Sequence, residues 1–517
     1  RDAAHAVPAR RCPLRRYQGA MSYAKLDQHL KKLEALSHAQ SMLGVDEAVM
    51  MPEGGGEKRA EAMAGLATIY HEMASSPQVG DWLAAAAAED LAPEQRIAIR
   101  EQTRSYINLT CLSSAFVGKQ TEARIRSEQL WRQLRPSGDW AGFLPALSNV
   151  IALAREEAAM RADVLKLAPY DALIEQFDPG SRVSQITPVF DELKSFLKGF
   201  IPKALEAQAA RHAKHPPKAF TARFAIDRQK ALGEVMMKAV GFDFNHGRLD
   251  VSHHPFCGGV PTDVRMTTRY DESDFLFALM GVLHETGHGL YEQGLPKAWS
   301  HWSVGQARGM AVHESQSLFV EKQIGRNPAF WEWALPVVKE KLGAEALSGW
   351  SLADMMQHVH RVKPGFIRVD ADEVTYPMHV ILRYELEQDL IAGRMEARDI
   401  PEAWDAKMTS YLGLSTKDNM KDGPMQDVHW PSGAFGYFPS YTLGALLAAQ
   451  QAATIHKRHP DADEALKKGD VTVLNDWRRT NIWSKASTLT TPDLIVAATG
   501  EPLSARHFIA HVQQRYG

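Results

Sequence analysis

The segment with the clearest chemical potential is His284-Glu285-Thr286-Gly287-His288, in which two histidines flank a glutamate in the order H-E-x-x-H. It lies in an apolar stretch whose spacing predicts a helix from near Ser273 to near Gly294. Positions i and i+4 share one face of a helix, so both imidazoles can bind one zinc ion. Glu285 is then placed to act on a water molecule that the metal holds.

A zinc site of this kind needs a third protein ligand, and the segment from Gly309 to Leu318 supplies one. Glu314 follows His288 by 26 residues, which is enough for a turn and an antiparallel return. Two histidines and one glutamate leave a fourth position open for water, as in catalytic zinc sites. His313 is an alternative ligand, although its different angle on the helix favours a hydrogen-bonding role. The plainer interpretation is that the histidines lie on a helix surface and that Glu314 is an ordinary solvated carboxylate.

This ligand set indicates hydrolysis, because the sequence carries no haem, flavin or nucleotide signature. Zinc acidifies bound water toward neutrality and polarises a peptide carbonyl. Glu285 can take the proton from that water and deliver it to the leaving amine.

Most of the chain has the texture of helices that would position this segment. From Met21 to about Lys214, apolar residues recur at three and four positions, and Pro- and Gly-containing breaks divide the stretch into pieces of helical length. Between Phe220 and Tyr270 the pattern alternates, which predicts a small hairpin or a three-stranded sheet beside the H-E-x-x-H helix. After Asp274 the helical pattern returns, with loops near Pro364-Gly365 and from Asn419 to Phe438.

Composition excludes several functional classes. Of the 517 residues 45% are hydrophobic and 23% charged, and the net charge of −3 is spread without long blocks, so we expect no nucleic-acid partner. No apolar run approaches the ~20 residues that cross a bilayer. Three cysteines are too few for a disulfide framework, which favours the cytoplasm. Residues 1–20 are rich in arginine, and we interpret them as an upstream extension or, as the weaker option, a transit peptide. Residues 21–517 are expected to form a single large domain, for which the length allows two lobes.

Five further segments accompany the zinc motif, and together they resemble the thermostable, Taq-type metallocarboxypeptidase family. They match the patterns H-P-F, D-x-R-x-T, H-E-S-Q, I-R-x-x-A-D and G-x-x-Q-D-x-H-W. In this chain they are His254-Pro255-Phe256, Asp263 to Thr267, His313 to Gln316, Ile367 to Asp372 and Gly423 to Trp430. The resemblance runs from Met21 across nearly the whole chain.

The resemblance implies a mainly helical, saddle-shaped metallopeptidase with a deep groove. It also implies a homodimer, zinc that cobalt can replace, and removal of single C-terminal residues with broad specificity. His284, His288 and Glu314 match the metal ligands, and Glu285 matches the general base.

Recognition of a terminal carboxylate calls for an arginine, whose fork is permanently charged and bidentate. Arg368 is the first choice and Arg265 the second. The alternative for either is a structural ion pair, with Asp370, Asp372 or Asp263 as the neighbouring partner.

Three further side chains are candidates for the stabilisation of a developing oxyanion. His429 is the first candidate, and the resemblance supports it; Tyr437 and Tyr441 are the candidates for a second donor. Gln426 and Asp427 are better suited to orienting His429 or a ligand. His254 is expected at the closed end of the groove.

Two other functions remain open from the sequence. A zinc oligopeptidase, which cuts inside short peptides or releases dipeptides, uses the same metal motif. A non-catalytic peptide-binding protein is the other possibility, and the presence of Glu285 argues against it.

Overall fold

The computed structural model describes residues 22–252 and 255–517, and they form a mainly helical fold, as predicted. Prolines begin several helices because the first helical position needs no backbone N–H, as Pro77 and Pro93 show. The helices of the first half are α1 (Ser22–Val49), α2 (Gly56–Ala74), α3 (Pro77–Ala86), α4 (Pro93–Thr110), α5 (Ser114–Leu134), α6 (Trp140–Leu165), α7 (Pro169–Phe177), α8 (Val183–Lys214) and α9 (Ile226–Ala239).

A single three-stranded sheet in the described residues follows α9. Its strands are β1 (Gly247–Val251), β2 (Cys257–Val260) and β3 (Asp263–Thr268), in the order β1-β3-β2. β1 runs parallel to β3, with Leu249 opposite Met266, whereas β2 and β3 form an antiparallel hairpin. The three-stranded alternative of the prediction is therefore the one observed.

Helices resume after the sheet, as the periodicity predicts. They are α10 (Phe275–Gln293), α11 (Met310–Leu318), α12 (Pro328–Leu342), α13 (Leu352–Val359), α14 (Tyr376–Ile391), α15 (Ile400–Leu412), α16 (Pro439–Arg458), α17 (Ala462–Leu466), α18 (Thr472–Asn481), α19 (Thr491–Thr499) and α20 (Ala505–Tyr516). The predicted loop from Asn419 to Phe438 lies between α15 and α16.

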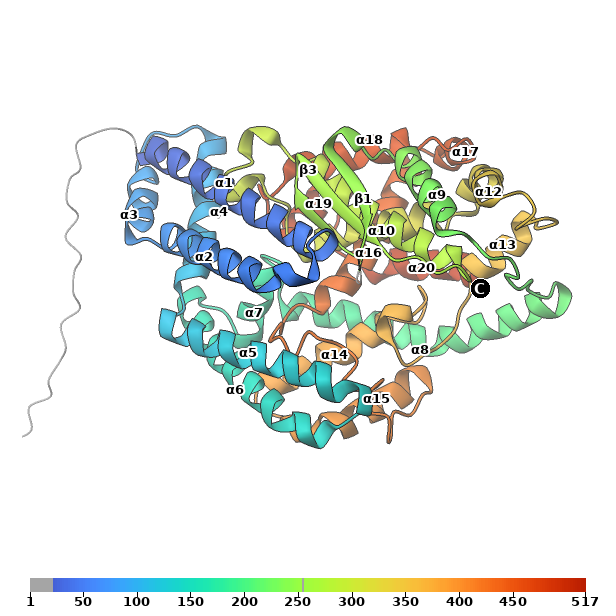
Figure 1. The fold of residues 1–517 in the computed structure, drawn as a ribbon, viewed down its shortest axis with the longest axis horizontal. Coiled ribbons are helices and arrows are strands. Elements are labelled where there is room, and N and C mark those ends of the chain that lie inside the picture. The colour runs from blue at the N-terminus through green and yellow to red at the C-terminus, as the bar shows by residue number, and fades with distance from the viewer. Residues whose placement is uncertain (1–21, 253–254) are drawn as a thin grey trace, which may run out of the picture.

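Two large apolar clusters form the core, and α16 contributes to both. One cluster joins the sheet to α9, α10, α12 and the C-terminal helices α17 to α19; the other joins α6, α7, α8, α14 and α15 (Figure 1). Leu443 and Leu446 of α16 face the second cluster, whereas Leu447 and Ile455 face the first. A smaller cluster holds α1, α3 and α4 against Trp302.

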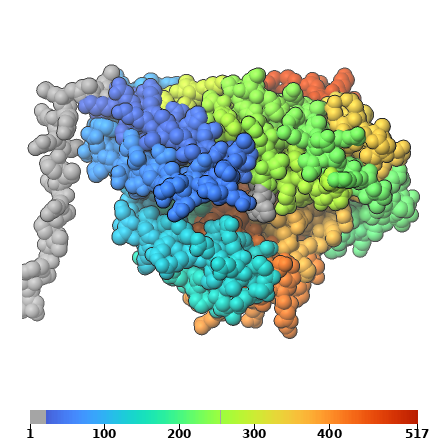
Figure 2. Space-filling view, in the orientation of Figure 1, coloured from blue at the N-terminus to red at the C-terminus, as the bar shows by residue number. Residues whose placement is uncertain are grey.

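The surface is hollowed between the N-terminal helices and α5–α6, and residues of the C-terminal part of the chain are visible inside the hollow (Figure 2). Within the described ranges, every helix is too short or too polar to cross a membrane.

Candidate active site

Helix α10 carries the H-E-x-x-H segment. Asp274 caps the helix by accepting hydrogen bonds from the backbone N–H groups of Leu276 and Phe277, so the helix begins at Phe275, two residues later than predicted. Most of its length is buried in the first apolar cluster. His284 and His288 therefore have fixed directions, set by the packing of the helix that carries them.

A close approach of α11 brings Glu314 to the histidines. A Cβ atom at Gly287 would lie 2.3 Å from the backbone oxygen of Gln316, and one at Gly444 would lie 2.7 Å from the Cβ of Glu314. Both glycines thus allow α10 and α16 to pack directly against α11. This packing sets the distance between the three side chains.

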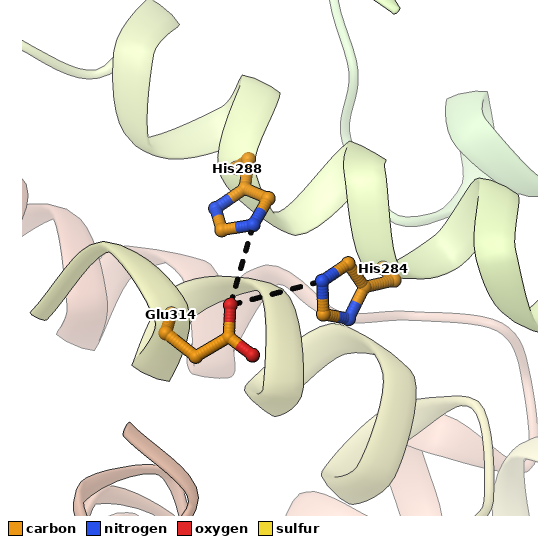
Figure 3. A group of neighbouring side chains, drawn as sticks. All are labelled: His284, His288 and Glu314. Atoms are coloured by element: carbon orange, nitrogen blue, oxygen red, sulfur yellow. Dashed lines mark ion pairs between the residues drawn. The ribbon is translucent and has the colours of Figure 1, made fainter. Parts of the chain in front are cut away.

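His284, His288 and Glu314 converge on one point (Figure 3). Their ligand atoms lie within 4.8 Å of one another. The Oε2 atom of Glu314 is 3.8 Å from Nε2 of His284 and 3.5 Å from Nε2 of His288. Two imidazole nitrogens and one carboxylate oxygen form a donor set that suits zinc.

The electrostatics of this cluster favour a cation. Burial lowers the pKa of His284, but the carboxylates of Glu314, Glu321 and Glu285 outweigh it and raise that pKa to about 9. Burial lowers the pKa of His288 to about 4, so this imidazole is neutral and able to donate a lone pair. Burial also raises the pKa of Glu285 to about 7. The residues present therefore fit a divalent metal ion, which would supply the positive charge.

Each histidine has a partner on its other ring nitrogen, and one of these partners, His313, has a further partner of its own. Sequence reasoning missed Glu321 and Glu292 and gave His313 as an alternative ligand or a hydrogen-bonding residue. His284 Nδ1 lies 3.1 Å from Oε2 of Glu321, in the π-helical turn η6 (Phe319–Ile324). His288 Nδ1 lies 2.6 Å from Nδ1 of His313, whose Nε2 lies 2.7 Å from Oε1 of Glu292. The available signal was spacing, since Glu292 follows His288 by four residues and Glu321 follows Glu314 by seven.

A cavity of about 480 Å³ opens beside these groups. Glu285 and Arg368 both line it, together with Tyr376, Tyr441 and Pro255. His254 lies outside the described residues, but the neighbouring Pro255 reaches the cavity.

Arg368 is buried and paired with a different acid from those expected in sequence. Its Nη2 and Nε donate to Oδ1 of Asp427 at 2.8 and 3.1 Å, and Nη1 donates to the Tyr376 hydroxyl at 3.1 Å. Asp370 and Asp372, the neighbouring acids that the alternative of a structural ion pair offered for Arg368, are therefore not its partners. Asp372 instead accepts from the backbone N–H groups of Val374 and Thr375 in its own turn and of Lys363, nine residues earlier. A contact across 59 residues has no local signal in the sequence.

Asp427 joins several of the predicted residues. It also accepts from Nε of Arg383 at 2.6 Å, and its Oδ1 lies 3.9 Å from Nδ1 of His429. Although burial opposes it, Arg383 and Arg368 hold the pKa of Asp427 far below its usual range. Gln426 accepts from the backbone N–H of Arg368, so it positions that residue.

The aromatic candidates gather around His429. Its Nε2 lies 3.0 Å from the Tyr441 hydroxyl, and the rings of Tyr437 and Tyr441 are 5.2 Å apart. Burial lowers the pKa of His429 to about 4 and raises the pKa of Tyr441 to about 12. A neutral imidazole and a protonated phenol thus lie side by side, and of the three candidates Tyr441 is the one that lines the cavity.

Arg265 lies away from the cavity beside the metal cluster. Its guanidinium forms a two-pronged ion pair with Asp263, at 2.5 and 2.8 Å, and does not line the cavity. This is the local pairing that the sequence offered as the alternative.

The chain is similar to known proteins over nearly its whole length. The family model for "Carboxypeptidase Taq (M32) metallopeptidase" matches residues 25–516. Thermostable carboxypeptidase 1 of Thermus thermophilus is 37% identical over 516 residues, covering 97% of this chain and 98% of the relative. Carboxypeptidase 1 of Bacillus subtilis is 33% identical and covers 94% and 96%.

A solved structure, Trypanosoma cruzi metallocarboxypeptidase 1, superposes with a TM-score of 0.93 at 39% identity, covering 96% of this chain and 99% of that one. The chain therefore belongs to the carboxypeptidase Taq (M32) family of metallopeptidases, and it is a metallocarboxypeptidase, a hydrolase of peptides.

Proposed function

We propose that the metal is zinc, held by His284, His288 and Glu314, and that the enzyme releases single C-terminal residues with broad specificity. The observation that carries this proposal is the convergence of two Nε2 atoms and one carboxylate oxygen within 4.8 Å. By the same ligand chemistry, cobalt should substitute for zinc.

Glu285 is the proposed proton carrier. When bound, zinc acidifies a water molecule and polarises the peptide carbonyl. Glu285 is next to His284 and lines the same cavity, so its carboxylate can accept the water proton and then pass it to the leaving amine.

Tyr441 and His429 are the proposed donors to the oxyanion that forms during attack. Their mutual contact of 3.0 Å and the position of Tyr441 on the cavity wall support this role. Tyr437 packs against both and is the weaker candidate, acting as a second phenolic donor.

Arg368 is proposed to receive the terminal carboxylate of the substrate. Its guanidinium lines the cavity with Tyr376, and a permanently charged fork offsets the cost of burying a carboxylate. Arg265, engaged with Asp263, is the less supported alternative. We also keep His254 as the proposed end of the groove, a homodimer as the proposed assembly and the cytoplasm as the proposed compartment.

Hydrolysis of one tripeptide and of its C-terminal amide by zinc-loaded protein tests the proposal, with products identified by mass. We expect only the last residue to be released, from the free acid alone, and no hydrolysis by a Glu285→Ala variant. Equal cleavage of the amide would favour the zinc oligopeptidase. Hydrolysis that survives removal of all metal would overturn the zinc mechanism.

A further inference from the structure

The two histidines of the metal cluster differ in what lies behind them. His284 contacts a carboxylate directly, through the 3.1 Å distance from its Nδ1 to Glu321. His288 contacts a second imidazole, and a carboxylate follows only after that ring. Side chains behind a metal ligand set its orientation and its tautomer, so this difference has a chemical meaning.

The arrangement behind His288 is a row of three side chains from two helices. Glu292 lies on α10, two helical turns beyond His284, and His313 lies on α11, directly before Glu314. The distances along the row are 2.7 Å from Glu292 to His313 and 2.6 Å from His313 to His288. Tyr291 packs its ring against His313, with the ring centroids 5.4 Å apart.

The direction of each hydrogen bond in this row follows from one condition. If His288 binds metal through Nε2, the atom that faces Glu314, the proton of its neutral ring is on Nδ1. His288 Nδ1–H then donates to Nδ1 of His313, which must carry its own proton on Nε2. That Nε2–H donates to Glu292, whose carboxylate can only accept when ionised.

The same condition excludes His313 as a metal ligand in this arrangement. Its Nδ1 accepts from His288 and its Nε2 donates to Glu292, so neither nitrogen keeps a free lone pair.

We propose that His313 and Glu292 are positioning residues that fix His288 as the Nδ1–H tautomer and so hold its Nε2 toward the metal. This inference rests on the proposed metal site, and it adds two residues to the groups that the bound metal requires. Loss of an outer partner of this kind lowers metal affinity by about 10- to 100-fold.

The test is the zinc dissociation constant, measured by competition with a chromophoric chelator, for wild type, His313→Leu, Glu292→Met and Glu292→Gln. We expect the first two variants to bind zinc about 10- to 100-fold more weakly than wild type. Glu292→Gln should recover most of the affinity, because its amide oxygen still accepts from His313.

His301→Leu is the matched control. It removes another partly buried histidine that contacts a carboxylate, Asp27 of α1, at 2.6 Å, and it lines a different cavity from the one beside the metal cluster. Its zinc affinity should equal that of wild type. Thermal melting of each metal-free protein shows whether it folds. If His313→Leu does not fold, the zinc affinities of Glu292→Met and Glu292→Gln test the proposal.

The outcomes separate this inference from the proposed function. Wild type that binds no zinc would overturn the metal site itself. Wild type that binds zinc, beside folded His313→Leu or Glu292→Met that binds it equally tightly, would overturn only the positioning role.

Discussion

The cavity has two charged walls that are assembled differently. The metal wall presents His284, Glu285 and Glu314 to the cavity, and it includes His288, which contacts Glu314; all four come from the consecutive α-helices α10 and α11. The arginine wall presents Arg368 and Tyr441 to the cavity, and it includes Asp427 and His429, which contact these two side chains. Its residues come from a short turn, a long loop and the start of α16. The first wall is organised by helical spacing, and the second by a buried carboxylate that gathers residues distant in sequence.

The two walls are held in place by different contacts. In the metal wall, backbone contact at Gly287 fixes the distance between two helices. In the arginine wall, Asp427 binds both Arg368 and Arg383 in a largely buried pair of ion contacts. Substitutions in the metal wall should therefore lower the catalytic rate most. Substitutions in the arginine wall should also lower the free energy of unfolding.

The largest effect on rate is expected from Glu285→Gln. The variant keeps the shape of the side chain and all three metal donors but cannot take a proton, so kcat should fall on the order of 10³-fold. Steady-state hydrolysis and metal content measure the two properties. Loss of zinc from this variant would contradict the assignment, because it would make Glu285 a ligand.

The largest effect on stability is expected from Asp427→Asn. It leaves two buried guanidinium groups without a countercharge, which should cost about 3 to 5 kcal/mol of unfolding free energy in denaturant titrations. Asp263→Asn is the matched control, since it breaks the half-exposed pair with Arg265 and should cost under about 1 kcal/mol. Equal losses would mean that the arginine wall is not held by Asp427.

Arg368→Lys should weaken substrate recognition without removing the charge. A lysine cannot form the two-pronged contact with a carboxylate, so kcat/KM for a free-acid tripeptide should fall about 10- to 100-fold, the value of one to two charged hydrogen bonds. Arg265→Lys should stay within about twofold of wild type. The reverse order of these two variants would transfer the carboxylate site to Arg265.

The smallest effect concerns Glu387, which supports the arginine wall by accepting from Trp430, Tyr170 and the backbone of Gly436. Burial outweighs these hydrogen bonds and raises the pKa of Glu387 to about 7. The folded protein therefore holds more protons than the unfolded chain between about pH 4.5 and 7, and stability from this carboxyl declines as pH rises through that window.

Denaturant titrations of wild type and Glu387→Gln from pH 5 to pH 8 measure this contribution. The advantage of wild type should shrink on the order of 2 kcal/mol over that range. An advantage that grows with pH would show that the carboxyl is ionised in the folded protein.

The sequence predicted the metal wall more completely than the arginine wall for a physical reason. The spacing of His284 and His288 is a property of one helix, and Glu314 lies on the next α-helix along the chain. Asp427 was not foreseen as the partner of Arg368, because the two residues are 59 positions apart and meet only through tertiary packing. The parallel pairing of β1 with β3 was not visible for the same reason, since register depends on tertiary contact.

The mainly helical fold and its long loop before α16 were confirmed, because periodicity and proline positions are local signals. To predict Glu292 and Glu321 as partners of the histidines, the helical spacing would have to be extended beyond the H-E-x-x-H and H-E-S-Q motifs. The roles of the site residues remain predictions that the experiments above test.

Helix α16 also determines how the protein unfolds. Leu443 and Leu446 complete one apolar cluster, and Leu447 and Ile455 complete the other, so neither half retains an intact core once this helix detaches. Heating should accordingly give one cooperative calorimetric transition in which both apolar clusters come apart together. A fragment that contains the helices of one cluster without α16 should not fold by itself.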